Sequence, residues 1–224
     1  MNLGELAKIA AESGGVLYLM PILLFIVLWV SFERFLYLNR MTHLGEQTAQ
    51  AVDALPNLQG PQLKELADST PAPFKALLEV PVRYPQLRDS ARLSDILQET
   101  VMRQVPTLDR GLWILDTTVT LAPLLGLLGT IVGMFHAFQV LDAVSNNSTA
   151  ITGNVAEALL ATASGLVIAI IGLVTFNGLH NRMRLVVHQM ETLRTMLTNR
   201  LEGLQHHSST VDAAKPVYYA AQEA

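Results

Sequence analysis

The chain has 224 residues, of which 50% are hydrophobic and 15% are charged, and its formal net charge is -4. This apolar content is too high, and the charge too low, for an ordinary soluble domain. No excess of basic residues points to nucleic acid. The chain has no cysteine, which excludes disulfides, thiolate nucleophiles, iron–sulfur clusters and cysteine-based zinc sites.

Three stretches without charged residues are each long enough to cross a bilayer, which takes about 20 apolar residues. The uncharged parts are residues 13–32, 117–141 and 158–181. They predict an all-α membrane protein whose transmembrane helices occupy 13–32, 113–141 and 153–181. The first is interpreted as a retained anchor, because its apolar run is long and lacks the small-residue cleavage site of a signal peptide.

The Lys and Arg residues that flank these helices predict their orientation. Nine of them lie in 33–112 and five follow residue 181, whereas the link 142–152 has none and the N-terminal tail has one. Because cytoplasmic segments carry the excess of Lys and Arg, the N-terminus and the link are expected on the outer, periplasmic side. The loop 33–112 and the C-terminus are expected in the cytoplasm.

Outside the spans, the sequence predicts short helical elements. Residues 1–12 are expected to form an outward-facing amphipathic segment, and 33–112 a set of short cytoplasmic helices interrupted by seven prolines. The clearest of these helices is Ser90–Val105, which Pro106 is expected to kink or break. A loop so interrupted leaves little room for an active site, so the chain is not expected to be an enzyme or to hold a cofactor or metal.

The third span is expected to continue as a cytoplasmic helix over 182–205, before a disordered tail over 206–224. The extension carries an apolar stripe at helical spacing. The stripe comprises Leu185, Val186, Met190, Leu193, Leu197, Leu201 and Leu204. Such a stripe needs the loop helices or a neighbouring subunit to bury it.

Small residues share one face of each of the last two spans. On the second span they are Ala122, Gly126, Gly129, Thr130, Gly133 and Ala137, and Pro123 is counted with this packing face. On the third span they are Ala158, Ala161, Thr162, Gly165, Ala169 and Gly172. Small faces let helix backbones approach closely in lipid. They predict packing of these helices with each other, or else a face that lines a narrow polar path or holds a helix of another chain.

Two acids border these spans, Asp116 at the start of the second and Glu157 near the start of the third. Each is explained either by the helix dipole, which favours an acid near a helix N-terminus, or by a place on an ion pathway. We favour the pathway for Glu157, which adjoins the small face; Asp116 stays open, and His136 is interpreted as a packing residue. No carboxylate lies at mid-depth in a span, so a proton-relay acid is expected from a partner.

Two segments carry a resemblance to a known family. APLLGLLGTIVGMFHAF (Ala122–Phe138) and GNVAEALLATASGLVIAI (Gly153–Ile170) resemble the two signature helices of the MotA/TolQ/ExbB proton-channel family. The three spans and the large first loop are similar to its ExbB and TolQ branch, and the APLLGLLGT segment looks most like ExbB. By this resemblance Thr130 and Thr162 correspond to the pore threonines of the family, and Glu157 to the acid of its last span.

The resemblance implies a homo-oligomeric ring, typically a pentamer, in the bacterial inner membrane. The ring would surround an ExbD-like partner with one transmembrane helix, whose Asp carries protons. The proton motive force would then drive a movement that a TonB-like protein passes to outer-membrane transporters. The expected partners are these proteins, further copies of the chain and membrane lipid, and no nucleic acid. Three alternatives stay open: a TolQ-like subunit of the Tol–Pal envelope system, a non-conducting membrane scaffold, and a small channel that conducts by itself.

Overall fold

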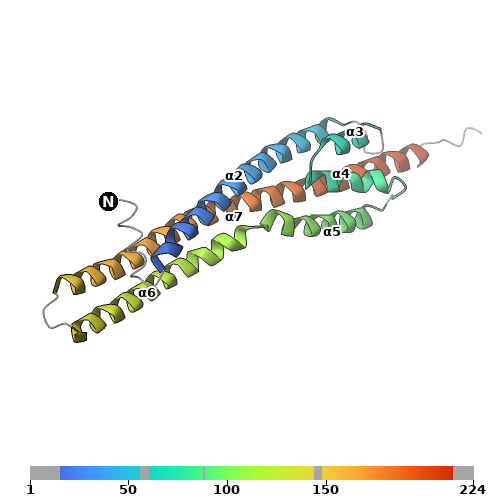
Figure 1. The fold of residues 1–224 in the computed structure, drawn as a ribbon. Helices are drawn as coiled ribbons and strands as arrows, with labels where there is room; N and C mark the ends of the chain where they lie inside the picture. The colour runs from blue at the N-terminus through green and yellow to red at the C-terminus, as the bar shows by residue number, and fades with distance from the viewer. Residues whose placement is uncertain (1–15, 56–60, 88, 144–147, 214–224) are drawn as a thin grey trace, which may run out of the picture. The chain divides into compact units, whose positions relative to one another are not determined.

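The computed structural model describes residues 16–55, 61–87, 89–143 and 148–213, and these residues are helical almost throughout (Figure 1). The helices are α2 (Val16–Ala54), α3 (Pro61–Ser69), α4 (Phe74–Arg83), α5 (Ser90–Asp109), α6 (Leu112–Ala143) and α7 (Ser148–Ala213). No strand occurs in this part of the chain. The all-α class is therefore confirmed. The segment predicted over residues 1–12 lies outside the described residues.

Three of the helices are long and apolar enough to cross a membrane. The candidate spans lie in Val16–Ala54, Leu112–Gln139 and Thr152–Arg200, each of which contains an 18-residue apolar stretch with at most two charged residues. Large apolar side chains on these helices point away from the protein interior, as Trp29 and Phe32 do with 65% and 66% exposure. Such surfaces suit lipid and not water. The chain is accordingly a membrane protein with three transmembrane helices.

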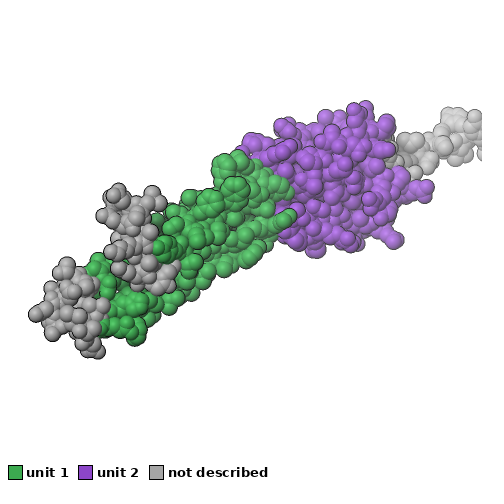
Figure 2. All heavy atoms as spheres, viewed as in Figure 1, with its two compact units in different colours: residues 1–37, 109–181 green, residues 38–108, 182–224 purple. Residues whose placement is uncertain are grey.

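Two compact units divide the chain (Figure 2). The first consists of residues 1–37 and 109–181 and contains the uncharged stretches; we call it the apolar unit. The second consists of residues 38–108 and 182–224 and contains α3, α4 and nearly all of α5; we call it the polar unit. Helices α2 and α7 contribute residues to both units.

Pro106 was expected to kink or break α5, and it does not break the helix. The helix continues through it to Asp109. Pro106 is exposed, and a helix tolerates the missing N–H best on its solvent side, where water can reach the freed carbonyl. The chain breaks instead at Gly111, whose φ of +84° is rarely adopted by residues with a side chain. A Cβ at Gly111 would also lie 3.2 Å from Nε of Arg34.

Helix α7 continues without a break to Ala213 and therefore includes residues 182–205, where the sequence predicts an extension of the third span. This helix also takes in eight residues of the segment predicted to be a disordered tail; residues 214–224 lie outside the description. Within the polar unit, the stripe of α7 is buried at Val186, Met190, Leu193 and Leu197. Leu185 was wrongly assigned to that stripe, since it is 49% exposed.

Polar contacts join α2 to α7 in the polar unit. Arg182 donates from Nη1 to Oδ1 of Asn39 over 2.5 Å, and Gln189 donates from Nε2 to the carbonyl of Thr42 over 3.1 Å. Gly45 of α2 lets the two helices approach, since a Cβ there would overlap the side chain of Gln189 on α7; it would also lie 2.7 Å from Cζ of Phe74 on α4. The two helices are therefore in register along this unit.

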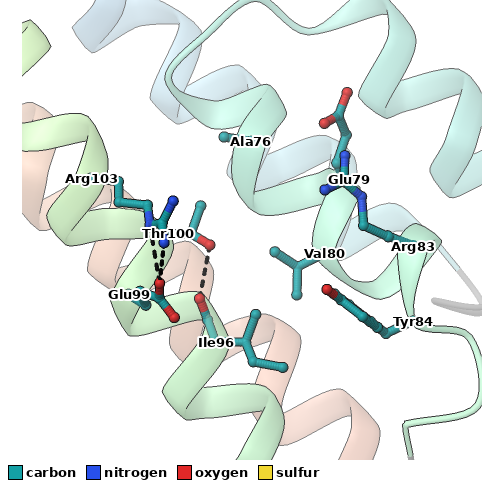
Figure 3. Close-up of a pocket in the computed structure, with 9 residues that line it drawn as sticks. All are labelled: Ala76, Glu79, Val80, Arg83, Tyr84, Ile96, Glu99, Thr100 and Arg103. Atoms are coloured by element: carbon teal, nitrogen blue, oxygen red, sulfur yellow. Dashed lines mark hydrogen bonds and ion pairs between the residues drawn. The ribbon is translucent and has the colours of Figure 1, made fainter.

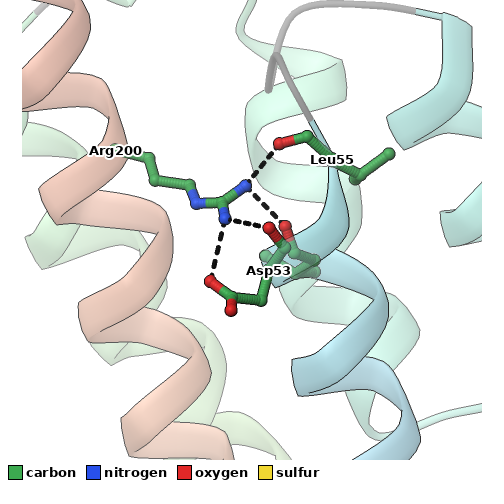
Figure 4. A network of polar contacts seen from close by, with 4 residues as sticks. Asp53, Leu55 and Arg200 are labelled. Atoms are coloured by element: carbon green, nitrogen blue, oxygen red, sulfur yellow. Dashed lines mark hydrogen bonds and ion pairs between the residues drawn. The ribbon is translucent and has the colours of Figure 1, made fainter.

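Arg200 closes the C-terminal end of α2 (Figure 4). Its Nη1 donates to the carbonyls of Val52 (2.5 Å) and Leu55 (2.7 Å). Its Nη2 donates to the carbonyl and to Oδ1 of Asp53, over 2.5 Å and 3.0 Å. The last carbonyls of a helix have no partner within it, and a cation there is also favoured by the helix dipole. One side chain of α7 thus satisfies the exposed end of α2.

Replacing Arg200 by alanine is expected to fray the last turn of α2, because three carbonyls lose a charged donor. A hydrogen bond to a charged group contributes about 1.5–3 kcal/mol, so the loss should be measurable in spite of partial solvent exposure. The measurement is amide hydrogen exchange of peptides covering residues 46–55. Arg40→Ala is the control, since Arg40 is an exposed arginine of α2, the helix whose exchange is measured. Equal exchange in both variants would contradict a capping role for Arg200.

Candidate functional site: the seam between α6 and α7

The small residues of α6 and α7 face each other within one chain, in the apolar unit. A Cβ on Gly126 would lie 3.0 Å from both the carbonyl oxygen of Ala161 and Cα of Thr162. A Cβ on Gly133 would lie 2.7 Å from Cβ of Ala158, and one on Gly165 would overlap the carbonyl oxygen of Ala122. Only residues without a side chain allow this approach, which we call the α6–α7 seam. In lipid, such close packing is what holds helices together.

The small faces predicted on the last two spans thus pack against each other within one chain. Gly129 belongs to the same seam, since a Cβ there would lie 2.8 Å from Cβ of Ala161. Pro123 is half-buried inside α6. A helix of another chain cannot lie on glycines that α7 already covers, so it would have to contact the residues at the edge of the seam. The role of these residues toward a partner helix stays a prediction.

The side chain of Thr162 forms a hydrogen bond across the seam, and Thr130 lies one helical turn from the residue that accepts this bond. Oγ1 of Thr162 donates to the carbonyl oxygen of Gly126 over 2.9 Å. In α-helical geometry the same carbonyl accepts the main-chain N–H of Thr130. Oγ1 of Thr130 donates to the carbonyl of Leu127 in its own helix over 2.6 Å. Both hydroxyl protons are therefore used by backbone carbonyls, and each oxygen is left as an acceptor.

The side of the seam that carries these hydroxyls is not the side that meets α2. A Cβ on Gly129 would lie 3.4 Å from Cγ1 of Val16, and one on Gly172 would lie 4.0 Å from Cγ1 of Val27. Successive residues of an α-helix are about 100° apart, so Thr130 points well away from the direction of Gly129. We call the side of α6 and α7 that bears Thr130 and Thr162 the threonine flank. Both threonines are half-buried in the single chain.

Glu157 does not lie on the threonine flank. It precedes Thr162 by five positions, which places it about 140° around α7. The side chain is half-buried, and its Oε1 is shielded from solvent. The three residues grouped by the sequence therefore split into two threonines on one flank and an acid on another. A role for Glu157 in the proton path or at an interface between copies stays a prediction.

The remaining candidates lie nearer the ends of α6. Asp116 is exposed in its second turn. His136 is half-buried, with its ring 6.2 Å from that of Phe135. Sequence reasoning missed Arg34, which is only 9% exposed and lies with its guanidinium 5.5 Å from the ring centre of Tyr37. Its position two residues after the first uncharged stretch was the available signal. Oε2 of Glu33 lies 3.0 Å from Nε of Arg34, but off the N–H direction, so the contact is an ion pair without a hydrogen bond.

A second concave feature lies in the polar unit between α4 and α5 (Figure 3). It is a cavity of about 320 Å³ with Val80 and Ile96 among its lining residues. Some of its polar groups already bond each other: Nε and Nη2 of Arg103 donate to Oε1 of Glu99 over 3.0 and 2.5 Å. In the described part of the chain no cluster of His, Asp and Glu could hold a metal ion. The α6–α7 seam is therefore the candidate functional site.

Fold and seam together define a class: a membrane protein of three transmembrane helices, whose last two spans are packed through glycine and alanine and carry paired hydroxyls on one flank. Residues 69–192 of the chain match the MotA/TolQ/ExbB proton channel family, which is more than half of its length. The chain belongs to this family.

Individual relatives agree with this assignment. The chain is 29% identical over 174 residues to the biopolymer transport protein ExbB-like 1 of Synechocystis, covering 74% of this chain and 66% of that protein. It is 38% identical over 84 residues to ExbB-like 3 of the same organism, covering 36% and 40%. It is 39% identical over 82 residues to the biopolymer transport protein ExbB of Xanthomonas campestris, covering 36% and 32%. The chain thus spans less than two thirds of the length of each of these relatives.

Proposed function

We propose that the chain is an ExbB-like subunit of a proton-driven motor in the bacterial inner membrane. Several copies would form a ring, typically of five, around the transmembrane helix of an ExbD-like partner. The partner's membrane Asp would carry the proton, and a TonB-like protein would pass the movement to outer-membrane transporters. The chain would have no enzymatic activity of its own. Its N-terminus would face the periplasm and its C-terminus the cytoplasm.

The observation that carries this proposal is the pair of hydroxyl oxygens on the threonine flank. Thr130 and Thr162 lie within one helical turn, with their protons directed at the carbonyls of Leu127 and Gly126. Their oxygens can accept a hydrogen bond from a protonated carboxylic acid but offer no proton to a carboxylate. Burying an ionised carboxylate in lipid is costly, whereas the neutral acid needs only such an acceptor. The flank therefore suits the passage of an acid in its protonated form.

The absence of a mid-span acid supports a partner. The uncharged stretches 117–141 and 158–181 contain no carboxylate that could relay a proton. A titratable relay is the usual device for moving protons within a membrane. The energy is adequate, because one charge that crosses 100 mV releases about 2.3 kcal/mol. Each proton can therefore bias one step of a moving part.

The proposal is tested by reconstitution. The chain is purified alone and together with a one-span partner that carries a membrane Asp, and native mass spectrometry counts the copies of each. A pH-sensitive dye then reports proton flux in vesicles under an imposed potential. A closed ring that takes up fewer partner copies and conducts only with them is the expected result. A monomer that ignores the partner would refute the motor, and flux from the ring alone would favour a self-sufficient channel.

A further inference from the structure

The threonine flank continues along α6 to a titratable residue. Asp116, Pro123 and Thr130 follow one another at intervals of seven residues. Seven residues fall about 20° short of two helical turns, so the three positions lie within about 40° of one line. Asp116 is displaced from Thr130 along this line by about 21 Å, at 1.5 Å per residue. It stands at the end of the apolar unit where α6 begins.

On α7, too, a titratable residue lies in the same direction around the helix as the threonine of the flank. His180 follows Thr162 by 18 residues, which is five full turns, so the two share one direction around the helix. The His180 ring is stacked on Phe176, with ring centres 5.8 Å apart. The helices are antiparallel, because Gly165 meets Ala122 while Gly172 meets Val119. His180 and Asp116 therefore stand at the same end of the α6–α7 pair.

The carboxylate of Asp116 is exposed to solvent. Among the described residues no ion pair or hydrogen bond involves this carboxylate; only the main-chain carbonyl of Asp116 accepts a side-chain bond, from Oγ1 of Thr120. Within the apolar unit, the other titratable or charged residues described at this end are Glu33, Arg34 and Tyr37 on α2, Asp109 and Arg110 before α6, and His180 on α7. Glu33 is paired with Arg34 over 3.0 Å. A structural ion pair thus does not account for Asp116.

We propose that Asp116 is the proton-release group of this site, placed where the threonine flank meets the cytoplasm, with His180 as the neighbouring base. This inference rests on the proposed function and names a further residue for it. A proton that leaves the partner's acid between Thr130 and the start of α6 must reach water at the end of the apolar unit where α6 begins. Asp116 accepts it there as a carboxylate and gives it to bulk water or to His180. No bond other than O–H or N–H is made or broken.

The alternative is that Asp116 only complements the dipole of α6, which would stabilise the helix by about 0.3–1 kcal/mol. Asp116→Asn removes the titratable group and keeps its size, and Asp116→Glu restores the function one methylene further out. Asp95→Asn is the matched control, because Asp95 is an exposed acid of α5 and the variant has the same net charge. The unaltered chain and the three variants are each reconstituted with the one-span partner. Proton flux is then recorded while the pH is varied on the side of the membrane where α6 begins.

We expect Asp116→Asn to form the ring and bind the partner, but to conduct severalfold more slowly and to lose part of the pH dependence. Asp116→Glu should recover most of the flux, and Asp95→Asn should behave as the unaltered chain. An unchanged rate and pH profile in Asp116→Asn would overturn the inference. So would equal slowing by Asp95→Asn, which would indicate a general charge effect. If the unaltered chain does not conduct with its partner, the proposed function itself fails, and this outcome is distinct from either result.

Discussion

Replacing Gly165 by alanine is expected to lower the thermal stability of the purified chain and the yield of folded protein. A Cβ at this position would overlap the main-chain carbonyl oxygen of Ala122 and lie 3.3 Å from Cα of Gly126. Both neighbours are backbone atoms, so no side chain can rotate to relieve the overlap, and the two helices must move apart. Overpacking of this kind costs about 1–3 kcal/mol. Circular dichroism of the detergent-purified chain during heating measures the effect.

Gly178→Ala is the control for this experiment, because it makes the same change in the same helix and unit. No atom lies within 4 Å of a Cβ at Gly178. Alanine is the better helix former by about 1 kcal/mol, so this variant should be as stable as the unaltered chain or more stable. The two substitutions are thus expected to shift the unfolding midpoint in opposite directions. If both lowered it equally, the seam would not be as tight as the distances at Gly165 indicate.

The sequence was sufficient for features that depend on long, regular patterns. Uncharged stretches of 20 residues or more gave the three spans, and an apolar stripe at helical spacing gave the continuation of α7 to residues such as Met190 and Leu197. These signals are summed over many residues, so single exceptions do not change them. Leu185 was such an exception: it follows the spacing but stands at the edge of the stripe, and it is exposed.

Features that depend on a single residue, or on a contact between residues far apart in the sequence, could not be predicted from such patterns. Pro106 was expected to kink or break α5; the helix continues through it, and the break falls at Gly111, where the backbone adopts a positive φ beside Arg34. A proline inside a helix costs one hydrogen bond, and only tertiary structure decides whether the helix survives. The four bonds of Arg200 to the end of α2 join residues about 145 positions apart, and no local sequence pattern predicts them.

The candidate site was predicted in its parts, but its arrangement was not. Thr130 and Thr162 were identified by motif and lie close together, as the hydrogen bond from Thr162 to Gly126 shows. For the glycines, the sequence left open whether they pack the two spans together or hold a partner helix; in the structure their Cα atoms are covered by α7 of the same chain. Simple helical arithmetic would have separated Glu157 from Thr162, since five residues correspond to about 140°. Only the structure shows which side of the seam meets α2, because a Cβ on Gly129 would lie 3.4 Å from Cγ1 of Val16.

Replacing Thr130 by valine is expected to abolish most of the proton flux of the reconstituted complex while leaving the chain as stable as before. The hydroxyl bonds only the carbonyl of Leu127 in its own helix, and that carbonyl keeps its regular helical partner. Valine has nearly the same shape as threonine, so packing along the seam is preserved. What disappears is the acceptor oxygen on the threonine flank. Thr130→Ser keeps that oxygen and should conduct.

Thr162→Val separates structure from transport in a second way, because its hydroxyl also joins two helices. Loss of the bond to Gly126 should destabilise the chain by about 0.6 kcal/mol, the average for such bonds within membranes. Flux should fall as far as in Thr130→Val, although the cost in stability is larger. A packing role would instead make the loss of flux follow the loss of stability, so that Thr130→Val would conduct normally. The comparison of the two valine variants therefore decides whether the oxygens serve the proton or only the seam, and normal flux in the Thr130→Val, Thr162→Val double variant would exclude the first.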